Sequence, residues 1–247
     1  MNSLFYEVFQ RPSETAQDLA ADILTRNGYF AERGDAFVYG EGTIPVLLVA
    51  HTDTVHRRPP TDIYCDAKAK VVWSPQGIGG DDRAGVYAIA RLLADGYRPH
   101  VLFPDEEESG GAGAREAAAS LLPDVNCLIE LDRMHHNDAV TYECANPAWD
   151  RWIERRGWAL DWGSFTDICT LMPAWGIAGV NLSVGYYNQH TTSEYVRLDQ
   201  LARTIGRVAR ILRNPPKHLF PFMAEQRRKW YDDSLALDLD WDTNRWR

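Results

Sequence analysis

The chain has 247 residues, of which 45% are hydrophobic and 25% are charged, an ordinary composition for a folded protein with a sizeable core. The formal net charge of −9 argues against general nucleic-acid binding, which needs an excess of basic side chains. The apolar runs are all shorter than the roughly 18 residues that cross a membrane. We therefore expect one soluble α/β domain.

The cysteines and the N-terminus indicate the compartment. The four cysteines form no C-x-x-C pair, and they are few for a chain of this length, so a disulfide framework is not expected. The first residues contain no basic segment followed by a long apolar run, which excludes a signal peptide. These features predict a cytoplasmic protein with reduced thiols.

Apolar periodicity predicts helices and strands that alternate along the chain. Helices are predicted at residues 13–27, 82–94, 111–122, 147–156 and 198–212. Strands are predicted at 29–39 (one or two), 44–50, 100–103, 125–131, 139–144 and 177–184, with a hairpin or loop at 61–74. The alternation predicts a mixed, mainly parallel sheet covered by helices on both faces, a three-layer α/β/α sandwich.

The pattern divides the chain into a single catalytic domain, residues 1–213, and a C-terminal tail, residues 214–247. The tail begins at Asn214-Pro-Pro216, and after it a basic cluster gives way to alternating acids and leucines. We expect this tail to dock on the domain or to be partly disordered.

His51 follows the continuous apolar run at residues 44–50, which is typical of a strand buried on both faces. In open parallel sheets functional groups gather at the carboxyl ends of the strands. Asp53 lies two residues later, and a carboxylate commonly orients a metal-binding imidazole through its second ring nitrogen. A histidine and an aspartate in a polar loop are the plainer interpretation of this short motif.

Asp81 and Asp82 lie between Gly80 and Gly85. A carboxylate that bridges two cations must approach them closely, and glycines allow the backbone geometry that this requires. The plainer alternative is an aspartate that caps the following helix. Both interpretations hold together if Asp81 is a metal ligand and Asp82 is the cap.

An acidic run, residues 105–108, directly follows the strand predicted at 100–103. The glycines at 110 and 113 favour Glu107 as a proton carrier and Glu108 as a metal ligand, whereas counting from Asp105 would favour Glu106 and Glu107. A solvated helix end is the usual interpretation of such a run.

Asp132 ends the next strand, and it is preferred as a ligand to Glu130 because only the terminal residue reaches an open crevice. His190 supplies the second nitrogen ligand. The paired His135-His136 is expected to be solvent-exposed, and Asp167 is expected to cap a helix rather than to take part in the site.

Two imidazoles and three carboxylates suit a pair of divalent ions such as zinc. In their order along the chain these motifs resemble the co-catalytic zinc exopeptidases, which include aminopeptidases, carboxypeptidases, tripeptidases and N-acyl amino acid deacylases. The resemblance implies that His51 and Asp132 hold one metal, Glu108 and His190 hold the other, and Asp81 bridges them. It also implies that the Asp81–Asp82 peptide is cis. The 57 residues between Asp132 and His190 leave no room for an inserted dimerisation domain.

The expected activity is hydrolysis of a peptide or small amide by an aminopeptidase-type exopeptidase, with Glu107 as general base and Asp53 in support. An N-acyl amino acid deacylase and an inactive binding protein on the same fold are the alternatives. The sequence predicts neither a nucleic-acid nor a membrane partner, and it leaves the oligomeric state open.

Overall fold

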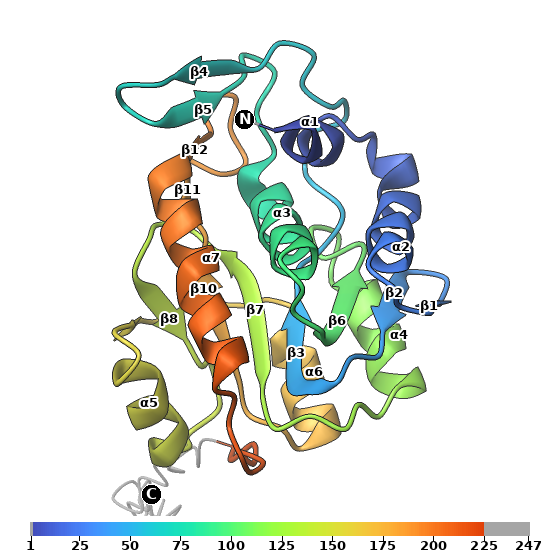
Figure 1. The fold of residues 1–247 in the computed structure, drawn as a ribbon, viewed down its shortest axis with the longest axis vertical. Coiled ribbons are helices and arrows are strands. Elements are labelled where there is room, and N and C mark those ends of the chain that lie inside the picture. The colour runs from blue at the N-terminus through green and yellow to red at the C-terminus, as the bar shows by residue number, and fades with distance from the viewer. Residues whose placement is uncertain (1, 225–247) are drawn as a thin grey trace, which may run out of the picture.

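The structure is a computed structural model that describes residues 2–224. A mixed sheet runs through the centre of the protein (Figure 1). Its eight strands lie in the order β1-β2-β6-β3-β7-β10-β8-β9. Their bounds are β1 Ala31–Arg33, β2 Phe37–Gly40, β3 Ile44–Val49, β6 Pro99–Pro104, β7 Leu128–Arg133, β8 Asp138–Val140, β9 Ala159–Leu160 and β10 Gly179–Ser183. The mixed α/β sandwich predicted from the sequence is confirmed.

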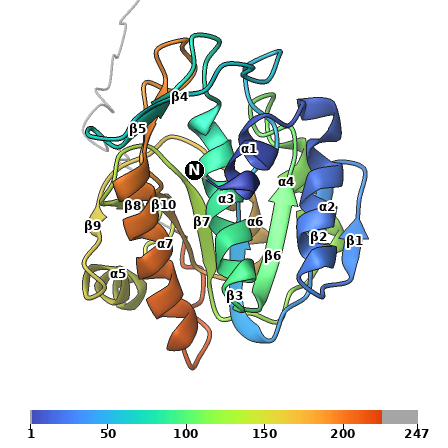
Figure 2. The same ribbon diagram turned by 45° about the horizontal axis from the view of Figure 1, so that its top comes forward.

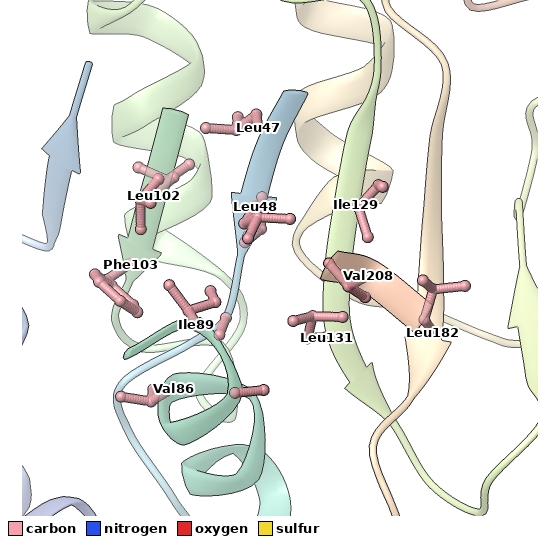
Figure 3. Packing of buried hydrophobic residues seen from close by; sticks show 14 of the residues in the cluster. Leu47, Leu48, Val86, Ile89, Leu102, Phe103, Ile129, Leu131, Leu182 and Val208 are labelled. Carbon is pink, nitrogen blue, oxygen red and sulfur yellow. The ribbon is translucent and has the colours of Figure 1, made fainter. Parts of the chain in front are cut away.

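The four central strands, β6, β3, β7 and β10, are parallel, and antiparallel pairings join them to β2 and β8 on either side. These strands are buried on both faces, which explains the apolar runs of β3 and β6, whereas β7 and β10 also bury the polar side chains of Glu130 and Asn181. Figure 3 shows Leu48, Ile129 and Leu182 on neighbouring strands, with Val208 of a covering helix beside them. The main core therefore lies directly along the sheet.

Helices cover both faces of the sheet (Figure 2). One face carries α1 Ser3–Phe9, α2 Ala16–Arg26, α3 Gly80–Ala94 and α7 Leu198–Arg213, and the opposite face carries α4 Ala112–Ser120 and α6 Ile168–Trp175. Helix α5, Pro147–Glu154, packs near the β9 edge, and a short 3₁₀ turn, η1 Ser13–Thr15, precedes α2. No helix within residues 2–224 combines the length and the apolar character that a membrane crossing requires.

A second, antiparallel sheet of four strands lies above the carboxyl ends of the central strands (Figure 1). It consists of β4 Tyr64–Asp66, β5 Val71–Trp73, β11 Tyr186–Tyr187 and β12 Tyr195–Arg197. The hairpin predicted at residues 61–74 is present as β4 and β5, but the sequence did not predict its partners. The loop that carries His190 connects β11 to β12, so this sheet positions one side of the site.

Several boundaries differ from the prediction. The strand expected at residues 139–144 ends at Val140, and β7 continues through Asp132 to Arg133 instead of ending before it. Helices α1 and α6 were not predicted. After α7 the chain returns along the domain, where Phe220 packs against Trp149. The tail predicted at 214–247 lies mostly outside the described residues.

Candidate metal centre

The residues predicted to bind metal come together at the carboxyl ends of the central strands. His51 follows β3, Glu108 follows β6 and Asp132 lies near the end of β7. Asp81 begins α3, and His190 reaches the same point from the loop between β11 and β12. Parallel strands place their carboxyl ends on one edge, which explains how residues so distant in sequence meet.

Asp81 lies between two imidazoles. Its Oδ1 is 3.1 Å from Nε2 of His51, and its Oδ2 is 3.2 Å from Nε2 of His190. Asp132 Oδ1 is 3.6 Å from the same nitrogen of His51, and Glu108 Oε1 is 3.0 Å from that of His190. The donors therefore fall into two groups, one around each imidazole, and Asp81 contributes one oxygen to each group.

The donor atoms are close enough to share ions. Ligand atoms of His51, Asp81 and Glu108 lie within 4.8 Å of one another, and so do those of His51, Asp82 and Asp132. Imidazole nitrogens and carboxylate oxygens suit divalent ions such as zinc. The group of His51, Asp82 and Asp132 contains Asp82, which the sequence suggested only as a helix cap. Asp82 does accept a hydrogen bond from the Gly85 amide at 3.0 Å, and it is a further candidate ligand.

The cluster carries strongly shifted pKa values. Burial opposes a charged His51, but the carboxylates of Asp132, Asp53 and Asp81 outweigh it and raise the pKa of His51 well above 6.5. Burial, with the charge of Asp81, raises the pKa of Glu108 to about 7 and that of Asp132 to about 6. These carboxyl pKa values are raised by burial first and by neighbouring carboxylates second, and bound positive ions would lower them.

Close packing requires a glycine at position 85, in the first part of α3. A Cβ atom at Gly85 would collide with the main-chain carbonyl oxygen of Leu131 and lie 2.5 Å from Oδ2 of Asp82. Helix α3 therefore packs against β7 at this point without a side chain between them. This contact sets the first turn of α3 beside Asp132. The peptide between Asp81 and Asp82 is cis, as the family resemblance implied.

Solved structures with the same fold were found by comparison. The chain is similar to a tripeptidase from Staphylococcus aureus (TM-score 0.70, 15% identity, 85% of this chain and 96% of that one). It is also similar to the aminopeptidase PepT from Bacillus cereus (TM-score 0.66, 16% identity, 84% and 96%) and to an aminopeptidase from Desulfurococcus kamchatkensis (TM-score 0.66, 14% identity, 85% and 93%). This chain has the zinc-exopeptidase fold. No protein-family model and no curated protein sequence matches it.

In this zinc-exopeptidase fold Asp53 joins two loops. Its Oδ1 is 3.1 Å from Nδ1 of His51, so an Nδ1–H donor leaves Nε2 free to face the cluster. Asp53 also accepts hydrogen bonds from the amides of Glu107 and Glu108, each at 3.1 Å. One carboxylate thus orients His51 and holds the acidic loop after β6.

The glutamates of the acidic run differ in their exposure. Glu106 is exposed, whereas Glu107 and Glu108 are half-buried and line a cleft of about 190 Å³ with Asp81 and His190. Burial raises the pKa of Glu107 to about 8, the opposing charge of His51 notwithstanding. Both Glu107 and Glu108 face the cleft, but only Glu108 belongs to a group of possible metal ligands.

Three side chains that the sequence did not single out form hydrogen bonds with Asp132. Thr166 donates to Oδ2 of Asp132 at 3.1 Å, and the Tyr186 hydroxyl lies 3.2 Å from Oδ1. The side chain of Asn181 accepts from the Asp132 amide at 2.9 Å. These partners come from three different segments, so no local motif could have revealed them.

Glu194 is a further residue that the sequence did not single out. Its side chain is 1% exposed, and its carboxylate accepts hydrogen bonds from the amides of Gly79 at 2.8 Å and Asp81 at 3.0 Å. It also lies 3.1 Å from Nε2 of His56. Glu194 therefore fixes the backbone that presents Asp81. The only sequence signal is a lone acid between His190 and the apolar strand β12.

The remaining candidates lie outside the cluster or differ from expectation. His135 and His136 are exposed, as expected, and Nδ1 of His135 is 3.2 Å from a carboxylate oxygen of Asp138. Asp167 occupies the N-cap position of α6, as expected, but its side chain makes no capping hydrogen bond. Neither oxygen of Asp167 has a hydrogen-bond partner within residues 2–224, and burial raises its pKa to about 7.

Proposed function

We propose that this protein is a metal-dependent amide hydrolase of the aminopeptidase type that works with two divalent ions. The single observation that carries the proposal is the position of Asp81, whose two oxygens face the imidazoles of His51 and His190 separately. A carboxylate so placed can bridge two cations. The similar tripeptidase and aminopeptidase structures support peptides as the substrates.

The donor set fits zinc. His51 and Asp132 would hold one ion, His190 and Glu108 would hold the other, and Asp81 would join both. When bound, the ions would polarise the amide carbonyl and make water more acidic. Asp53 would keep His51 in the correct tautomer, and Glu194 would hold the backbone of Asp81.

Glu107 is the proposed general base. It would accept a proton from the attacking water and deliver that proton to the nitrogen of the leaving amine, so that the amide C–N bond breaks without releasing an anionic nitrogen. Its carboxyl group lines the cleft beside Asp81 and His190, where the scissile bond would lie. Without bound metal the pKa of Glu107 is about 8. Positive charge nearby lowers this pKa, which favours the basic carboxylate form.

The test compares Glu107→Gln with Glu106→Gln. Both changes replace a carboxylate by an amide of the same shape in the same loop, but Glu106 is exposed. Loss of a general base costs about 10²–10⁴-fold in rate, so Glu107→Gln should lose peptide hydrolysis and keep its metal, whereas Glu106→Gln should remain active. Unchanged activity of Glu107→Gln would remove this residue from the mechanism.

Substrates with free and acetylated N-termini identify the reaction more closely. We expect hydrolysis of short peptides with a free amine and little hydrolysis of their N-acetylated counterparts. The opposite preference would assign the protein to the deacylases. Absence of hydrolysis of either kind by the zinc-loaded protein would contradict the proposed function.

A further inference from the structure

A larger cavity adjoins the metal cleft. It has a volume of about 630 Å³, within the range of cavities that bind small molecules. Tyr142, Ser164 and Phe165 line both this cavity and the metal cleft, so the two spaces share a wall. A group held in the cavity would therefore lie next to a bond held in the cleft.

Apolar side chains form part of the wall of the cavity, among polar ones. Val140 lies at its side, Met172 and Pro173 come from α6, and Phe222 comes from the segment after α7. Trp162 also lines it, although 78% of this side chain is exposed. A large aromatic side chain left in solvent at the edge of a cavity gains burial when an apolar group fills the cavity.

The charged groups on the lining are acidic. Glu143 and Asp161 belong to it, and among residues 2–224 no lysine, arginine or histidine lines the cavity. Asp161 accepts a hydrogen bond from Arg133 at 2.8 Å, and Arg133 lines the metal cleft rather than this cavity. An acidic side chain of a ligand would therefore lose its hydration here and meet no cationic partner in the described lining.

We propose that this cavity binds a large apolar side chain of the peptide substrate, on a residue that flanks the scissile bond, and discriminates against acidic side chains. The inference rests on the proposed function, and it adds the class of substrate. Leucine, methionine and phenylalanine fit the apolar part of the wall, whereas alanine leaves most of it uncovered. Each additional methylene group buried in such a pocket increases kcat/KM by roughly 10-fold or more.

The experiment measures kcat/KM of the zinc-loaded protein for dipeptides in which either residue is Leu, Phe, Ala or Glu. At one of the two positions we expect Leu and Phe to exceed Ala by at least about 10-fold and Glu to be the poorest. Trp162→Ala should reduce the preference for Phe over Ala. Cys169→Phe, which fills the cavity from the first turn of α6, should reduce kcat/KM for Phe and Leu but not for Ala.

Phe30→Ala is the matched control. Phe30 is 86% exposed, belongs to neither cavity, and should leave the preference unchanged. If Cys169→Phe lowers the thermal midpoint, Trp162→Ala decides, since its side chain is mostly exposed. Equal rates for all side chains, a preference for Glu, or no effect of Trp162→Ala would overturn the inference and leave the proposed function standing. Failure to hydrolyse any peptide would contradict the proposed function itself.

Discussion

Removal of zinc with a chelator is expected to lower the thermal stability of the protein, and the loss should be larger at pH 8 than at pH 5.5. The reason lies in the buried carboxyl groups. Burial raises the pKa of Asp132 to about 6, and that of Glu108 and of Asp167 to about 7. Each of these groups binds its proton more tightly in the folded protein than in the unfolded chain.

The sign follows from that difference. A raised carboxyl pKa contributes stability that is present below about pH 4 and is lost as the pH rises through 6 and 7. For Asp167, a rise from 3.8 to about 7 corresponds to up to about 4 kcal/mol. The bond with Asp81 raises the pKa of His190 to about 9, so its contribution is also lost towards higher pH. The lowered pKa of Asp53 adds stability that is already complete above about pH 4.

Bound zinc opposes this loss of folding stability at higher pH. Its ligands must be deprotonated, so zinc competes with protons and binds more weakly at pH 5.5. At about 100 times the Kd each site adds about 2.7 kcal/mol. In a domain of this size 1 kcal/mol corresponds to about 2–4 °C, so each site should raise the midpoint by about 5–11 °C.

The assay is calorimetric unfolding with zinc and with chelator at pH 5.5, 7 and 8. Asp81→Ala is the control, and it should show a much smaller zinc effect at every pH. An equal zinc effect at pH 5.5 and pH 8, or none at all, would refute the reasoning.

Three substitutions test separate parts of the structure. His190→Ala should reduce bound metal, and retention of two ions per chain by elemental analysis would contradict its role as a ligand. Glu194→Gln places a side-chain N–H against the backbone N–H of Gly79 or Asp81, so one of these hydrogen bonds is lost and zinc titration should show weaker binding. An unaltered zinc affinity would exclude the positioning role of Glu194. Leu48→Ala leaves a cavity at a fully buried position of β3 and should lower the free energy of unfolding by about 2–5 kcal/mol in denaturant titration; a loss under 1 kcal/mol would show that the site collapses.

Strand β3 was predictable because it is a continuous apolar run followed by a polar residue. Residues 44–50 showed this pattern, and β3 occupies Ile44–Val49 with His51 just beyond it. Helix α6 was not predictable, since it is short and contains Pro173, which opposes helix formation in isolation. Strands β11 and β12 have two and three residues, too few for a period to be visible.

Four of the five proposed ligands were visible because each stands at or just after a strand end or beside glycines, where the chemistry of metal binding selects few residue types. His190 has no such neighbours, and it was chosen because it supplies the second nitrogen ligand. Glu194 and Thr166 were not visible, because their roles depend on contacts with segments far away in the chain. Asp82 was assigned only its local role as a cap. The sequence could not indicate that Asp82 also lies near His51 and Asp132, since that requires the packing of α3 against β7.

Metal content measured by elemental analysis, on the zinc-supplied protein and on Asp81→Ala, tests the central claim most directly. Asp81 is the residue shared by both donor groups. The account predicts two ions per chain in the unaltered protein and a clear reduction in Asp81→Ala. No bound metal after zinc is supplied, or two ions retained without Asp81, would contradict the bridged site.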